Sequence, residues 1–124
     1  MNQAFELLGG EPGIRKLVDR FYDLMDSLPQ ATTIRAMHPE DLSGSRDKLT
    51  WFLVGRFGGP PLYEERVGHP RLRARHMPFA VDDAAADAWM QCMNQALSEQ
   101  VGHPVIRQGL SDFFRQVAQA VRNQ

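Results

Sequence analysis

Four histidines are the residues in this chain best suited to bind a metal: His38, His69, His76 and His103. Either nitrogen of a neutral imidazole can donate its lone pair to a transition metal. None of the four is spaced as His-Glu-x-x-His, and Cys92 is the only cysteine, so neither a zinc helix nor a cysteine cluster is expected. The sequence still permits a metal site that takes a single imidazole from the protein.

His76 lies in the stretch "GHPRLRARHMPFAV", residues 68–81, which fits neither a helix period nor a strand period. One axial imidazole is enough for haem iron, because the porphyrin supplies four nitrogens. The arginines of "RLRAR" could reach two haem propionates, and Met77, Pro78 and Phe79 could line an apolar slot. Spacing alone favours the simpler interpretation, in which the arginines are a solvated basic run and His76 is a loop histidine.

Four long helices are predicted around this stretch, because apolar residues recur three and four positions apart. The first begins after Gly9-Gly10 and ends near Pro29, and the second runs from about Ser43 to Phe57. The third begins at Asp82-Asp83 and ends at Gly102-His103-Pro104. The fourth carries an apolar stripe from Ile106 to Val121. Residues 31–37 could add one short helical turn. No segment alternates as a half-buried strand does, so an all-α fold is expected.

Residues 58–81 are predicted to form a long irregular connection between two of these helices. Connections of that length are uncommon in compact domains, and are usually functional or disordered. Disorder fits poorly here, because regularly placed apolar residues could anchor the segment: Leu62, Tyr63, Val67, Leu72, Met77, Phe79 and Val81. We therefore expect this connection to pack against something other than a neighbouring helix.

Length and charge narrow the class of protein further. A chain of 124 residues is expected to form one domain over residues 1–124. A net charge of −1 gives no general attraction to nucleic acid or to an anionic membrane. The lone cysteine and the absence of a leader-like or membrane-spanning apolar run favour a soluble protein of the cytoplasm.

Over nearly its whole length the chain resembles the truncated haemoglobins, specifically those of group II. The matching stretches are "LLGGEPGIRKLVDRFYDLM" (7–25), "HPEDL" (38–42), "DKLTWFLVGRFGGPPLYEERVGHPRLRARHMPF" (47–79) and "DAWMQCM" (87–93). The resemblance implies a truncated globin fold, a two-over-two helical sandwich around haem b, in which an extended loop replaces most of the proximal helix. It also implies that His76 is the proximal iron ligand.

On the distal side, the resemblance matches Tyr22 and Trp89 to two hydrogen-bond donors and His38 to a third position. Ser45 occupies the place of the distal histidine in other globins, so no histidine clamp is expected there. The alternative from the residues alone is that Tyr22 and Trp89 are core residues whose polar atoms bond to protein carbonyls.

The resemblance also assigns residues to the haem itself. Lys48 and Tyr63 match residues that hold propionates in relatives, and Arg75 is a further candidate. Leu49 lies one turn from Ser45 on the same face of the distal helix. Phe52 and Phe79 are expected to contact haem, with core packing as the alternative. His69 and His103 are expected in turns, and Cys92 as a packed residue.

The function implied is reversible binding of dioxygen and other diatomic ligands, with nitric oxide, carbon monoxide and peroxide as further ligands. Redox detoxification of oxygen, nitric oxide or peroxide would need an external reductase. Donors that hold oxygen tightly argue mildly against bulk transport.

A non-enzymatic oxygen carrier or gas sensor is the alternative, although a sensor needs an output segment that this chain does not offer. A helical interaction module without cofactor is a third possibility. The oligomeric state expected is a monomer or homodimer.

Overall fold

The computed structural model describes residues 3–124, and within that range it is helical with no strand. The α-helices are α1 (Ala4–Leu7), α2 (Gly10–Ser27), α3 (Thr32–Ala36), α4 (Ser43–Arg56), α5 (Leu62–Arg66), α6 (Leu72–His76), α7 (Asp83–Gln100) and α8 (Pro104–Ala120), with a 3₁₀ turn, η1 (Pro29–Ala31), before α3. The prediction of an all-α fold is confirmed, as are the four long helices.

Local signals explain where the long helices start. Gly9 has a left-handed φ of 92° directly before α2, a conformation that glycine adopts without steric cost. The carboxylate of Asp82 accepts a hydrogen bond of 2.8 Å from the amide of Ala85 and caps α7. At α8, Pro104 occupies the first turn and the His103 imidazole accepts from the amide of Ile106 at 3.5 Å. His103 is therefore a helix-capping residue.

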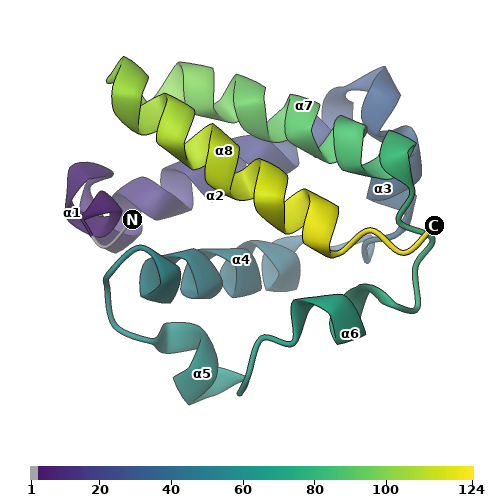
Figure 1. Ribbon diagram of the computed structural model, residues 1–124, viewed down its shortest axis with the longest axis horizontal. Coiled ribbons are helices and arrows are strands. Elements are labelled where there is room, and N and C mark those ends of the chain that lie inside the picture. The colour runs from purple at the N-terminus through teal and green to yellow at the C-terminus, as the bar shows by residue number, and fades with distance from the viewer. Residues whose placement is uncertain (1–2) are drawn as a thin grey trace.

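The four long helices form two packed pairs, α2 with α4 and α7 with α8, and α2 also packs against α7. Figure 1 shows α7 and α8 on one side of the molecule, with α5 and α6 on the far side of α4. The core between the pairs consists of fully buried side chains, including Phe21, Phe57, Phe114, Ile14, Leu17, Met25, Leu53, Met93, Leu97 and Leu110. Cys92 is also fully buried on α7. The two-over-two arrangement is confirmed.

The prediction that residues 58–81 are irregular was wrong in part, because α5 and α6 lie inside them. Each is five residues long, little more than one turn, and too short for a period to be recognised. In α6, moreover, no residue is buried, so the helix has no apolar stripe. The four-residue helix α1 was not predicted for the same reason of length.

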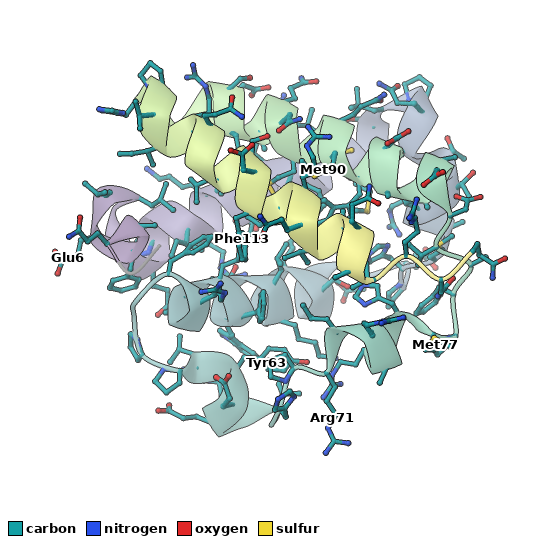
Figure 2. All side chains as sticks on the ribbon, in the orientation of Figure 1. Glu6, Tyr63, Arg71, Met77, Met90 and Phe113 are labelled. Carbon is teal, nitrogen blue, oxygen red and sulfur yellow. The ribbon has the colours of Figure 1, made fainter. Side chains whose placement is uncertain are left out.

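The apolar anchors expected in this connection divide into two kinds. Leu62, Tyr63 and Val81 are buried, whereas Met77 is 63% and Phe79 39% exposed. Figure 2 shows Tyr63 between α5 and α4, while Arg71 projects away from the molecule. The connection is thus anchored near its two ends, and its central part lies at the surface.

None of the helices in residues 3–124 combines the length and hydropathy needed to cross a bilayer.

Candidate functional site

A cavity of about 640 Å³ lies between the long helices and the connection of residues 58–81. Its wall includes residues of every helix from α2 to α8. The lining is mostly aliphatic and aromatic, and it includes no aspartate or glutamate from the described residues. A cavity of this size and character suits a largely apolar small molecule or cofactor.

The cavity brings together every residue that the family resemblance assigned to the site, whereas Arg71, Arg73 and Pro78 do not line it. The assigned residues are Tyr22, His38, Ser45, Lys48, Leu49, Phe52, Tyr63, Arg75, His76, Phe79 and Trp89. Met77, expected in an apolar slot beside His76, does not line the cavity and is largely exposed. That expectation was wrong, because His76 ends a helical turn and the chain does not continue along the cavity wall as an extended strand.

The imidazole of His76 is oriented by its own helix. Its Nδ1 lies 2.6 Å from the carbonyl oxygen of Leu72, one turn earlier in α6. A carbonyl can only accept, so Nδ1 carries the proton and the lone pair is on Nε2. This is how a metal-binding histidine is usually held, with one nitrogen bonded to the protein and the other free for the metal.

Tyr22 on α2 and Trp89 on α7 both line the cavity and each carries a hydrogen-bond donor. Neither the Tyr22 hydroxyl nor the Trp89 N–H forms a hydrogen bond within residues 3–124, although Tyr22 is only 6% exposed. No fully buried side-chain polar atom in that range lacks a partner, so these two atoms are not fully buried and keep some access to solvent. The alternative that protein carbonyls satisfy them is wrong.

The aromatic ring of Phe21 fixes the two donors relative to each other. Its centroid is 4.9 Å from that of Tyr22 and 4.8 Å from that of Trp89. Both distances fall in the range of attractive edge and tilted contacts between aromatic rings. Phe21 is fully buried, so the side chains of Tyr22 and Trp89 both pack against a residue of the core.

Burial raises the pKa of Tyr22, and the positive charge of Arg46 opposes this only partly. The Arg46 guanidinium lies 5.8 Å from the Tyr22 ring centroid. It is itself held by Asp19 at 3.2 Å and Asp23 at 2.8 Å, both on α2. Tyr22 is therefore a neutral hydroxyl at physiological pH, able to donate its proton in a hydrogen bond.

His38, which follows α3, faces Tyr22 with 5.8 Å between ring centroids. Its Nδ1 lies 2.8 Å from the carbonyl oxygen of Ile34, so Nε2 carries the lone pair. Burial lowers the pKa of His38; the bond to Ile34 opposes this, while the charges of Arg35 and His76 lower it further. At neutral pH, His38 therefore offers an acceptor to the cavity, whereas Tyr22 and Trp89 offer donors.

Two cations, Lys48 on α4 and Arg75 on α6, line the cavity. Arg75 donates from Nε to the carbonyl of Pro70 at 2.7 Å, and its guanidinium lies 5.6 Å from the Tyr63 ring centroid. Lys48 is exposed and forms no ion pair with the described part of the chain. Apolar walls, one free imidazole nitrogen and two cations fit haem, a flat apolar macrocycle with a central metal and two carboxylates.

Sequence reasoning missed a large part of the cavity wall. It predicted an apolar stripe on α8 but nominated none of its residues for the site, yet that helix lines the cavity with Phe113, Phe114, Val117, Ala118 and Val121. The wall also includes small residues on α7, Ala85 and Ala86, and Ile34 in α3 with Met37 directly after it. A helical period identifies an inner face, but it cannot tell whether that face meets another helix or a ligand.

Comparison with known proteins shows that this chain is similar to bacterial globins and truncated haemoglobins. Residues 3–123 match the family model described as bacterial-like globin. The group 2 truncated hemoglobin YjbI of Bacillus subtilis is 43% identical over 96 residues, which are 77% of this chain and 70% of that protein. A cold-adapted truncated hemoglobin from Pseudoalteromonas haloplanktis TAC125 superposes with a TM-score of 0.96 at 43% identity, covering 98% of each chain. A truncated oxygen-avid haemoglobin from Bacillus subtilis gives 0.89 at 38% identity, covering 98% of this chain and all of that one.

Proposed function

Because the chain belongs to the bacterial-like globin family as a group II truncated haemoglobin, and so is a haem-containing oxygen-binding protein, we propose that it binds dioxygen and other diatomic gases reversibly and uses them in redox detoxification. The cofactor proposed is haem b, with His76 as the iron ligand. Lys48, Tyr63 and Arg75 hold the propionates. The observation that carries the proposal is that Tyr22 and Trp89, two hydrogen-bond donors, line the cavity and form no hydrogen bond within residues 3–124.

A bound haem would supply iron that can bind a diatomic ligand and place partial negative charge on it. The Tyr22 hydroxyl and the Trp89 N–H then donate hydrogen bonds to that charge. Neither donor exchanges an existing protein partner for the ligand, because neither has one in residues 3–124. Ser45 and Leu49 on α4 and Phe52 and Phe79 close the apolar walls, which exclude water and strengthen these bonds.

The number of donors favours tight binding. A hydrogen bond to a charged group is worth roughly 1.5–3 kcal/mol, and each 1.4 kcal/mol is about a factor of ten in affinity. Two such bonds would slow the release of oxygen by orders of magnitude. Slow release suits a protein that uses bound oxygen in a reaction better than one that transports and unloads it. The Bacillus subtilis relative described as oxygen-avid supports this choice over bulk transport.

The detoxification proposed is the conversion of nitric oxide to nitrate. One dioxygen, one nitric oxide and one electron give one nitrate ion, so every turnover needs an electron from an external reductase. Tyr22 and Trp89 would serve this reaction by holding dioxygen until nitric oxide arrives. Peroxide reduction would use the same donors to polarise the O–O bond.

Stopped-flow mixing of the reduced, haem-loaded protein tests the proposal. We expect oxygen to bind within the mixing experiment, to be released slowly, and to give nitrate in equal amount when nitric oxide is added. Oxygen that is released rapidly and without oxidation of the haem would favour the carrier alternative. Absence of any spectral change with oxygen or carbon monoxide would overturn the proposal.

A further inference from the structure

The segment that carries His76 depends on the C-terminal end of the chain for its hydrogen bonds. Of the hydrogen bonds made by residues 69–81, every one that reaches another part of residues 3–124 ends on Asn123 or Gln124. The remaining ones stay inside the segment, such as the contacts of Arg75 with the carbonyls of His69 and Pro70. Figure 1 shows the C-terminus beside the connection between α6 and α7.

The side-chain amide of Asn123 forms three of these bonds. Its Nδ2 donates to the carbonyl oxygen of His76 at 3.2 Å and to that of Phe79 at 2.9 Å. Its Oδ1 accepts from the amide of Val81 at 2.9 Å. The backbone amides of Asn123 and Gln124 both donate to the carbonyl of Val81, at 2.8 and 3.2 Å. Both amide protons of the Asn123 side chain are thus used on the segment directly after His76.

Few other contacts hold α6 against the rest of the described chain: Leu72 is partly buried against the core, and the Arg75 guanidinium lies 5.6 Å from the Tyr63 ring centroid. The five residues of α6 include no buried side chain, and a helix of that length is not stable by itself. Inside α6, the Leu72 carbonyl fixes the imidazole relative to its own turn, but not relative to the cavity. On the C-terminal side of His76, the link to α7 passes through the main chain of residues 76–81, where Asn123 binds.

We propose that Asn123 is a positioning residue for the proximal imidazole, acting through the main chain of His76, Phe79 and Val81. The inference rests on the proposed function, in which His76 is the iron ligand. Asn123 does not line the cavity, so it acts without touching haem. With the amide removed, the turn that carries His76 would sample several positions, and the iron–histidine bond would become weaker and more heterogeneous.

The test compares Asn123→Ala with Asn94→Ala in the full-length, haem-loaded protein. Asn94 is a matched control, because its side chain accepts one bond, from Ser111 at 2.7 Å, and does not line the cavity. Resonance Raman spectra of the reduced, ligand-free protein report the iron–histidine stretch, and transfer of haem to a scavenger protein reports its retention. For Asn123→Ala we expect a broader band at lower frequency and about tenfold faster haem loss. Asn94→Ala should match the wild type in both.

Asn123→Asp is the second variant, since it keeps the acceptor for the Val81 amide and loses both donors to the carbonyls. It should show the altered band as well. An unchanged band in either variant, even with a lowered melting temperature, would overturn the inference and leave Asn123 a merely stabilising residue. His76→Gly separates the two proposals: if it leaves the wild-type band in place, the ligand assignment fails, whatever Asn123 does.

Discussion

At the scale of single residues, the side chains that line the cavity differ in whether they can donate or accept a hydrogen bond. Tyr22 and Trp89 can donate into the cavity, whereas the neutral His38 can only accept from its free nitrogen. The sequence identified all three positions, because the motif around each resembles those of a known family. It could not supply the protonation state of His38, which depends on the Ile34 carbonyl and on burial by residues distant in sequence.

Replacing Tyr22 by phenylalanine removes one donor and keeps the ring that packs on Phe21. We expect the oxygen dissociation rate to rise about tenfold or more, since a bond of roughly 1.5–3 kcal/mol to the ligand is lost. Ser111→Ala is the control, because it removes a hydroxyl that donates to Asn94 at 2.7 Å and does not line the cavity. Stopped-flow displacement of oxygen by carbon monoxide gives the rates. Equal rates in wild type and Tyr22→Phe would mean that the hydroxyl does not reach the ligand.

The lowered pKa of His38 predicts a pH dependence confined to acid solution. Above its ordinary value of 6.5 the imidazole is neutral whether the chain is folded or not, so it makes no difference to stability there. As the pH falls below that value, the unfolded chain takes up the proton first, and the native state loses stability until the folded pKa is passed. Inside the cavity, protonation would convert Nε2 from acceptor to donor.

Oxygen release should therefore be constant between about pH 7 and 9 and become slower below about pH 6. The control is His38→Phe, which has no titrating ring at this position and should lack the acid response. The measurement is the oxygen dissociation rate of both proteins across this pH range. The same acid response in His38→Phe would assign it to another group.

At the scale of elements, the long helices could be predicted because each has a face long enough to show its period. The short helices α5 and α6 could not, since five residues contain no repeat and α6 packs on the core only through the partly buried Leu72. Their formation depends on contacts with the long helices and with the C-terminal residues. These contacts link positions far apart in the sequence, such as Val81 and Asn123, and no local pattern encodes them.

One close approach between elements gives a direct test of the packing near α1. A Cβ atom at Gly13, in the first turn of α2, would overlap the backbone carbonyl of Leu8. Because backbone atoms cannot move aside cheaply, Gly13→Ala should destabilise the protein by about 1–3 kcal/mol. At Gly44 in α4, a Cβ would meet nothing within 4 Å, so Gly44→Ala should be neutral or stabilise by up to about 1 kcal/mol. Urea unfolding of both variants checks this, and equal effects would contradict the packing described.

At the scale of the whole molecule, the long helices and the connection of residues 58–81 enclose a shared cavity. The sequence predicted the helices and nominated the cavity's polar residues, but not its full wall. Residues of α8 such as Phe113 and Val117 appeared in the sequence only as an apolar stripe, because a cavity wall and a packed helix face have the same period. The distinction between them exists only once the chain is folded.

The central claim is that the His76 imidazole binds the iron of a haem held in this cavity. The most direct measurement is titration of haem into the haem-free protein, followed by the Soret band, for wild type and His76→Gly with and without added imidazole. We predict a stable, stoichiometric complex for the wild type, weak and heterogeneous binding for the variant, and recovery of the wild-type spectrum with imidazole. Haem binding by His76→Gly with an unaltered ligation spectrum in the absence of imidazole would contradict the claim.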